Sequence, residues 1–247
     1  MIIDVHAHLG PDCCFDFEQT ESELLEAYDR YQINKAIIQP NIPRPYLEDI
    51  RAAHDRILNF CSQNPGRIFG MISANPHLKN EDYRAEVMRC KNTRAFIGIK
   101  IHTLAYSVNP SSIDGMKVFD IAEETGLPVM IHTGNGIPFA DPAASYAAIK
   151  SHPGVLTVIS HTGGNMHQTQ AVILAREFEN VYLEPSWMPS VSIASMIKSV
   201  GSGKIMFGSD VVGNIKPALD TFSAVIKNDD DYENIMWKTA AKVFGIK

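Results

Sequence analysis

The chain has 247 residues, of which 45% are hydrophobic and 20% are charged, and its net charge is −6. This length fits one large α/β domain of about 250 residues, and the composition excludes a disordered or fibrous protein. The pI near 5.8 and the scattered lysines and arginines argue against a nucleic-acid partner.

The N-terminal segment MIIDVHAHLG carries no signal-peptide pattern, and no later apolar run reaches membrane-spanning length. We therefore expect a cytosolic protein that is not bound to a membrane. The sequence is also compatible with a homo-oligomer. The four cysteines form neither a disulfide framework nor a CxxC zinc pattern. Reduced thiols are expected, and the adjacent Cys13 and Cys14 are candidates to line a pocket.

Short apolar runs, most of them rich in β-branched residues, alternate with longer segments of helical period. Eight strands are predicted, at 2–6, 35–39, 68–73, 96–101, 128–132, 155–160, 181–184 and 205–207. Helices are predicted between and after them, near 21–32, 46–62, 81–90, 112–125, 141–151, 167–179, 190–200, 217–227 and 231–243. Thr20 with Glu23, and Ser111 with Asp114, have the spacing of a capping box at a helix start.

This alternation predicts a single (β/α)8 TIM barrel that occupies residues 1–247 as one domain. An open doubly wound sheet is the alternative. Such a sheet usually carries phosphate-binding glycines after its first strand, and here that turn reads HAHLGPDCC. The barrel is therefore favoured.

Polar side chains stand at the ends of five predicted strands, where a parallel barrel places its chemistry. They are His6 and His8, Lys100 and His102, His132, His161, and Asp210. Because side chains alternate along a strand, His6 and His8 point to one face while Ala7 points to the other. An isolated HxH is weak evidence, but His6, His8, His132, His161 and Asp210 at strand ends together predict a metal site, to which His102 has a weaker claim. His54, in a helix, and His152, before Pro153, are predicted to be surface residues.

With these residues at its strand ends, the chain resembles the amidohydrolase superfamily. Within it, the chain resembles the amidohydrolase-related branch that includes aminocarboxymuconate semialdehyde decarboxylase and aromatic-acid decarboxylases. The matching segments are IIDVHAHLG, FIGIKIHT, LPVMIHTG, TVISHTGG, NVYLEPS and IMFGSDV. The resemblance implies that His6, His8, His132 and Asp210 bind one divalent ion, for which Zn2+ is the first candidate. It also implies that His161 hydrogen-bonds the metal-bound water or the substrate.

The chain departs from that branch in two places. Its decarboxylases are typically longer, with extended loops around an aromatic-acid pocket, and the frequent Tyr-Pro after the last Ser-Asp is replaced by Val211-Val212. These differences weaken the case for decarboxylation.

A metal held by imidazoles and a carboxylate, with one open position, activates water and polarises a carbonyl. We assign catalytic roles to Asp210 as the base, to His161 as the group that orients water or stabilises the oxyanion, and to Lys100. A buried ammonium must be neutralised, carboxylated or paired with an anion. The resemblance offers two roles for Lys100: a carboxylated bridge between two ions, or a cation for a substrate carboxylate beside one ion, which we favour.

The predicted partner is a small molecule, with or without a carboxylate. The candidate loop residues that contact it are Arg44, Tyr106, Asn135, Trp187 and Met188. The predicted function is hydrolysis of a small amide, ester or lactone. The alternative is nonoxidative decarboxylation of a small unsaturated or aromatic carboxylic acid, which would release CO2. A metal-independent lactonase, which bound metal would argue against, and a noncatalytic binding protein are further possibilities.

Overall fold

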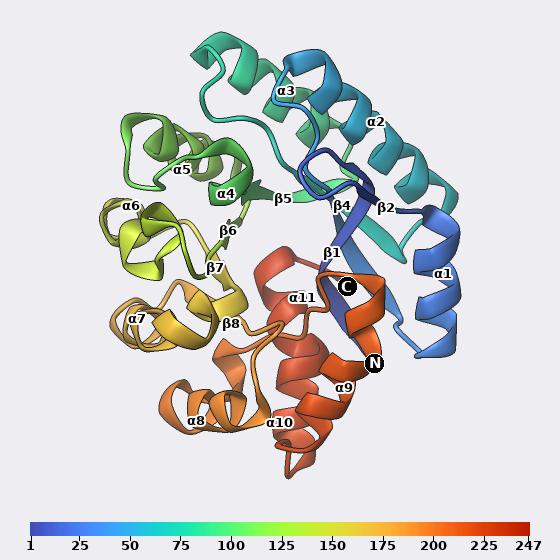
Figure 1. The fold of residues 1–247 in the computed structure, drawn as a ribbon, viewed down its shortest axis with the longest axis vertical. Coiled ribbons are helices and arrows are strands. Elements are labelled where there is room, and N and C mark those ends of the chain that lie inside the picture. The colour runs from blue at the N-terminus through green and yellow to red at the C-terminus, as the bar shows by residue number, and fades with distance from the viewer.

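The computed structural model describes residues 1–247, and a ring of parallel strands forms its centre (Figure 1). The strands follow one another in chain order, and a short strand, β2, pairs antiparallel with the outer end of β1. Their bounds are β1 Ile3–Asp12, β2 Phe17–Gln19, β3 Lys35–Pro40, β4 Ile68–Ile72, β5 Phe96–Ile101, β6 Val129–His132, β7 Thr157–Ser160 and β8 Val181–Glu184. Seven of the eight predicted strands are confirmed, six of them within two residues, whereas β1 extends six residues beyond its predicted end and β2 was not predicted.

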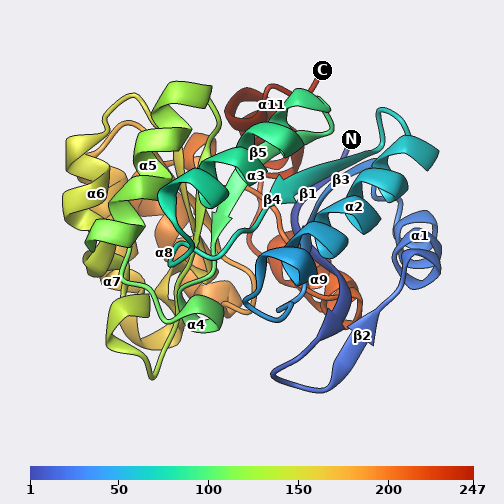
Figure 2. The same cartoon turned by 90° about the horizontal axis from the view of Figure 1, so that it is seen from above.

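Helices surround the strands, as Figures 1 and 2 show from two directions. They are α1 Glu21–Arg30, α2 Leu47–Gln63, α3 Asn80–Asn92, α4 Thr103–Tyr106, α5 Ile113–Thr125, α6 Tyr146–Ser151, α7 Gly164–Glu177, α8 Ser190–Val200, α9 Ile215–Ser223, α10 Asp229–Glu233 and α11 Thr239–Phe244. A π-helical turn, Asn234–Lys238, joins α10 to α11, so the last predicted helix is composite. None of these helices combines the length and apolar character needed to cross a bilayer.

The predicted eighth strand at 205–207 is not a regular strand, and this is a correction. The segment makes only single bridges, from Ile205 to Leu183 and from Asp210 to Ala7. Backbone hydrogen bonds nevertheless join it to β8, through Met206 N–H, and to β1, through the carbonyl of Phe207. The fold is therefore the predicted (β/α)8 barrel, with an irregular eighth position.

Close packing explains the irregularity. A Cβ atom built on Gly208 would lie 2.7 Å from the carboxyl group of Glu184, so the chain passes very near that side chain. Asp210, two residues later, has φ +71°, a left-handed conformation incompatible with a regular strand.

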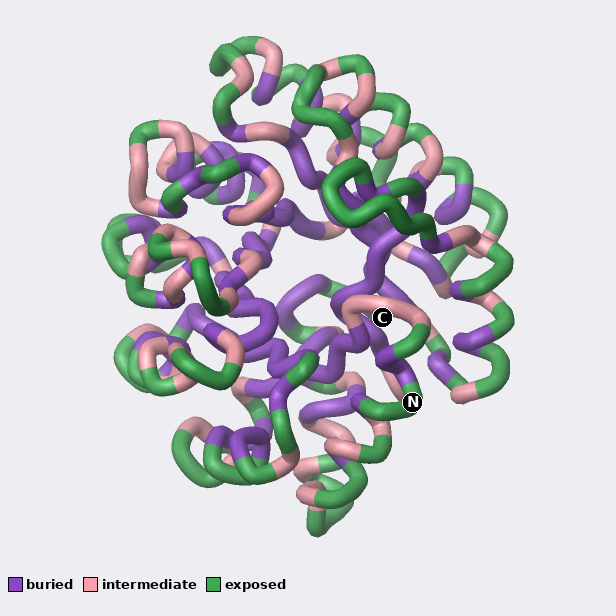
Figure 3. Tube along the Cα trace, viewed as in Figure 1, coloured by how far each residue is buried: buried purple, intermediate pink, exposed green.

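One apolar cluster fills the interior of the barrel, and a second lies between the strands and the surrounding helices. The strands are therefore buried on both faces (Figure 3). Ile3 and Val5 of β1 pack inside the ring with Phe244 of α11, which closes the end where the strands begin. Ala7 and Leu9 pack outside, against the helices. The side chains that face the interior of the barrel are therefore those of odd-numbered residues up to Val5 and of even-numbered residues from His6 onward. This change occurs because the register with β3 shifts between Asp4 and Ala7.

Of the two predicted capping boxes at helix starts, one is present in the structure and the other is not. Thr20 and Glu23 form the predicted capping box of α1. The prediction for α5 is wrong by one residue, because Ser112 caps the helix by accepting from Gly115 N–H. The Ser111 hydroxyl instead donates to the carbonyl of Ala144.

The prediction that His54 and His152 are surface residues is wrong, since they are 0% and 5% exposed. His54 lies on the buried face of α2, its Nδ1 2.7 Å from Glu86 Oε1 and its Nε2 accepting from Ser73 N–H. His152 likewise uses both nitrogens, toward Ala148 O and an oxygen of Asp120. A histidine with both nitrogens hydrogen-bonded can be buried at low cost.

Candidate metal centre

Three donor atoms converge where β1 meets the segment after β8. His6 Nε2 and His8 Nε2 lie 3.2 Å apart, and each lies 3.2 Å from Asp210 Oδ1. Strand alternation predicts that the two imidazoles share a face, and the structure confirms it. The backbone bond from Asp210 N–H to the His6 carbonyl brings the aspartate to the pair.

Outer hydrogen bonds select the tautomer of both imidazoles. His6 Nδ1 lies 2.6 Å from Glu184 Oε2, and His8 Nδ1 lies 2.8 Å from the carbonyl oxygen of Pro40. A carbonyl oxygen can only accept, and both oxygens of Glu184 also accept hydrogen bonds from Ser186, so we assign the proton to Nδ1 of each histidine. Both Nε2 lone pairs then face Asp210, as in metal sites whose histidines are oriented by a carboxylate or carbonyl.

The spacing of the three donors suits a small divalent cation. Donors around a tetrahedral ion at about 2.1 Å lie about 3.4 Å apart, and neighbouring donors of an octahedral ion about 3.0 Å apart. The observed 3.2 Å lies between the two. Imidazole and carboxylate donors suit Zn2+ as well as other first-row divalent ions.

Protonation favours metal binding as well. Burial lowers the pKa of His6 well below its usual range, so the ring stays neutral and keeps its lone pair. Burial alone would raise the pKa of Asp210, but His6, His161 and His8 outweigh it and hold that pKa well below its usual value. At neutral pH His6 therefore presents a lone pair and Asp210 a negative charge.

Asp210 is held on its other side by Trp187. The indole Nε1–H donates to Asp210 Oδ2 at 2.7 Å, which leaves Oδ1 directed at the two histidines. Trp187 also has positive φ, and the residue is 57% exposed.

His161 adjoins the donors without joining the triad. Its ring centroid lies 4.8 Å from that of His6, and its Nδ1 lies 2.8 Å from Ser186 Oγ. The Ser186 hydroxyl donates to Glu184 Oε2, so it accepts from His161 Nδ1–H and leaves Nε2 unprotonated. Burial lowers the pKa of His161 to about 4, so this ring is also neutral near pH 7.

The structure does not bring His132 into the donor triad. The donor atoms of His6, His8 and Asp210 lie within 4.8 Å of one another, a spacing that His132 does not share. Its ring lies edge-on to His161 at 4.9 Å and stacks on His102 at 4.4 Å. His132 therefore borders the site through its ring contacts with His161 and His102.

Lys100 lies inside the barrel, beside the triad. Its Nζ is 3.2 Å from His6 Nε2 and donates to Ser160 Oγ at 3.1 Å, and the residue is 1% exposed. Burial lowers the pKa of Lys100 to about 8, although Asp210 and Glu184 raise it. No carboxylate of the chain forms an ion pair with this ammonium, which is therefore available to an anion.

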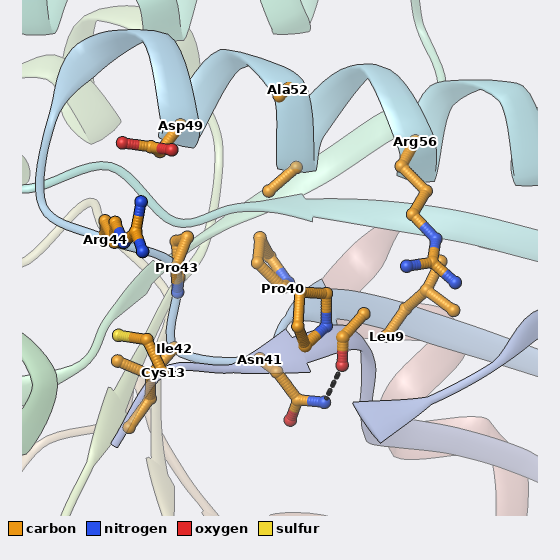
Figure 4. Close-up of a pocket in the computed structure, with 13 residues that line it drawn as sticks. Leu9, Cys13, Pro40, Asn41, Ile42, Pro43, Arg44, Asp49, Ala52 and Arg56 are labelled. Atoms are coloured by element: carbon orange, nitrogen blue, oxygen red, sulfur yellow. Dashed lines mark hydrogen bonds between the residues drawn. The ribbon is translucent and has the colours of Figure 1, made fainter. Parts of the chain in front are cut away.

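A cavity of about 400 Å³ opens beside the centre, between the outer ends of β1 and β3 and helix α2 (Figure 4). Arg44 and Cys13 line it, as does Pro40, whose carbonyl faces His8. None of the triad donors lines the cavity, so the predicted contact Arg44 is not placed at the metal site itself. Cys13 thus lines a pocket, as predicted, but a neighbouring one.

The other predicted contacts are dispersed. Tyr106 is buried and donates to the carbonyl of Ser73, Met188 is buried, and Asn135 is exposed. Only Trp187 reaches the triad directly. The residues that sequence reasoning missed are those supporting the donors, namely Glu184, Ser186, Ser160, Gln39 and Asp4. The glutamate at the end of the strand NVYLE was the one available signal.

The matching family model is described as amidohydrolase and covers residues 3–246. The chain belongs to the amidohydrolase family. It is accordingly an enzyme of the amidohydrolase superfamily, and the predicted resemblance is confirmed. No curated protein matches the chain in a sequence search.

Solved structures of the superfamily share the fold. A 2,6-dihydroxybenzoate decarboxylase in complex with 2,6-dihydroxybenzoate has a TM-score of 0.82 at 16% identity, covering 99% of this chain and 98% of that one. A dihydroxybenzoic acid decarboxylase from Polaromonas with bound manganese and the inhibitor 2-nitroresorcinol has a TM-score of 0.79 at 16% identity, covering 99% and 96%. A candidate 2-pyrone-4,6-dicarboxylic acid hydrolase from Pseudomonas putida has a TM-score of 0.75 at 14% identity, covering 100% and 98%. These likenesses support the barrel, and the family supports a divalent metal.

Proposed function

We propose that this amidohydrolase is a metal-dependent hydrolase of a small amide, ester or lactone. His6, His8 and Asp210 would hold one Zn2+, with His132 as a further ligand if its ring turns toward the ion. The observation that carries the proposal is the triad of donors 3.2 Å apart, with both histidine tautomers selected from outside. Three such donors leave coordination positions open to water and substrate.

When bound, the ion supplies an activated water and polarises the scissile carbonyl. Asp210 takes the proton from the attacking water and returns it to the leaving group. Its Oδ1 faces the site, and its low pKa keeps it ionised at neutral pH. Trp187 keeps Oδ2 occupied, so the carboxylate has one orientation.

His161 is the second polar group of the reaction. With Nδ1–H donated to Ser186, its neutral Nε2 accepts a hydrogen bond from the attacking water and orients that water. Lys100 supplies a positive charge, because its ammonium lies beside the triad with no carboxylate partner of its own. It would hold a substrate carboxylate or the developing oxyanion.

A second candidate, nonoxidative decarboxylation, rests on Lys100 as well. A buried ammonium next to the donor triad suits a substrate that carries a carboxylate. A substrate of this kind is suitable for hydrolysis as well as for decarboxylation. Either reaction involves a small-molecule partner, and we propose a cytosolic setting for it.

The experiment combines metal analysis with a substrate screen. Elemental analysis of the purified protein, His6→Ala and Asp210→Asn should find about one divalent ion per wild-type chain and much less in His6→Ala. Asp210→Asn should remain folded and lose turnover by a factor of 100 or more on any substrate found among amides, lactones and carboxylic acids. Near wild-type turnover in that variant would remove Asp210 from its role. CO2 release would select the decarboxylase.

A further inference from the structure

Asp4 is a fully buried acidic residue outside the donor triad, and each of its carboxyl oxygens is hydrogen-bonded. Oδ1 accepts from the backbone N–H of His6 at 3.1 Å and from that of Ser209 at 3.0 Å. Oδ2 accepts from the Ser209 hydroxyl at 2.6 Å. The residue is 0% exposed. One carboxylate therefore joins the chain at His6 to the chain just before Asp210.

The bond to His6 lies at a bulge in β1. The register pairs Asp4 with Ala36 and then Ala7 with Ile38, so β1 has one more residue than β3 over this stretch, and Val5 and His6 have no register partner. A bulge leaves backbone groups without ladder partners and redirects a side chain. Here Asp4 supplies the acceptor for His6 N–H, and the bulge turns the His6 ring toward the barrel axis.

The bonds to Ser209 lie where regular pairing fails. The segment that carries Asp210 makes only isolated bridges with its neighbours, and Asp210 itself has φ +71°. Apart from the single bond from Asp210 N–H to the His6 carbonyl, strand pairing therefore does not hold this aspartate. Two hydrogen bonds from Ser209 to Asp4, together with the bond from Asn214 to the Ser209 carbonyl, hold the turn in place.

We propose that Asp4 is a positioning residue that sets the distance between His6 and Asp210, so that the metal site exists before the ion arrives. The inference rests on the proposed function for the identity of the ligands. The carboxylate contacts neither the ion nor the substrate in this proposal. It acts through the backbone of two ligand-bearing segments, and the hydroxyl of Ser209 shares the task.

The test uses Asp4→Ala, Asp4→Asn and Ser209→Ala in the full chain. Glu86→Gln is the matched control, because Glu86 is an equally buried, multiply hydrogen-bonded carboxylate on α3, away from the site. Two quantities are measured: Zn2+ and Mn2+ affinity by competition with a chelator, and amide hydrogen exchange of metal-free protein by NMR.

Asp4→Ala should lower metal affinity by a factor of about 10 to 100, the range seen when groups supporting metal ligands are removed. It should also lose exchange protection at the amides of His6 and Ser209. Asp4→Asn retains an oxygen for both N–H groups and should stay within about threefold of wild type, whereas Ser209→Ala should fall between the two. Glu86→Gln should lose stability and keep wild-type affinity.

Wild-type metal affinity and wild-type amide protection in folded Asp4→Ala would overturn the inference. If Asp4→Ala does not fold, Ser209→Ala decides in its place, and unchanged affinity and protection there would overturn it equally. A wild-type protein that binds no divalent ion would instead refute the proposed function. Hydrogen exchange of the metal-free protein would still show whether Asp4 holds the segments that carry His6 and Ser209 together.

Discussion

Trp187 donates its indole N–H to Asp210 Oδ2 at 2.7 Å, and both residues have positive φ. Two backbone conformations that are unfavourable for these residue types are thus joined by one hydrogen bond at the mouth of the barrel. Such strain persists only where the surrounding structure maintains it, and it is common at functional sites. The bond also leaves a single oxygen of Asp210 to face the histidines.

The indole should therefore report metal binding. We expect Zn2+ addition to change tryptophan fluorescence in wild type and in Trp237→Phe, which retains Trp187, but not in Trp187→Phe. The chain has two tryptophans, so these variants separate their signals. Trp187→Phe should also lower turnover about tenfold, because a hydrogen bond to a charged group contributes about 1.5 to 3 kcal/mol and partial exposure reduces that. A metal-dependent signal that persists in Trp187→Phe would contradict the assignment.

Gly208→Ala should weaken metal binding through Glu184. The added Cβ would lie 2.7 Å from the Glu184 carboxyl group and displace it, and that carboxylate selects the tautomer of His6. We expect about a tenfold loss of Zn2+ affinity, measured by chelator competition. Gly213→Ala is the control, because a Cβ there meets nothing within 4 Å. Equal affinities in the two variants would argue against this role of Glu184.

Metal-free protein should lose stability in acid. Burial lowers the pKa of His161 to about 4 from 6.5, so between these values the unfolded chain binds a proton that the folded chain excludes. Stability therefore falls as pH falls through that window, by up to about 3 kcal/mol from this residue. Urea denaturation of chelator-treated protein at pH 7 and pH 4.5 should show a smaller loss for His161→Asn. The same loss in both proteins would show that His161 is not the group responsible.

His54→Ala should affect stability without affecting the metal. His54, Glu86 and Cys90 also gather three potential ligand atoms, but both nitrogens of His54 are already used, toward Glu86 and Ser73 N–H. Removing the ring leaves a cavity and unpaired polar groups, which should cost about 2 to 4 kcal/mol in urea denaturation. Metal content should stay at the wild-type value, whereas His6→Ala should lose it. A loss of metal in His54→Ala would indicate a second site.

The sequence alone predicted the barrel and the positions of seven of its strands, because periodic apolar patterns and turn residues are local properties. Phe96–Ile101 and Val181–Glu184 were predicted to the residue. Strand alternation placed His6 beside His8, and the order of strand ends placed Asp210 at the same mouth. These predictions needed only the period of a strand and the common direction of parallel strands.

Tertiary structure decided the rest, since its hydrogen bonds join residues far apart in the chain. Glu184 lies 178 residues from His6 and Ser209 lies 205 from Asp4, so no local pattern reveals either contact. The same holds for the burial of His54, which depends on a carboxylate from another helix. The sequence thus determined which side chains reach the mouth of the barrel. Packing and long-range hydrogen bonds determined that the donors of His6, His8 and Asp210 converge there, and which atom of each imidazole faces the site.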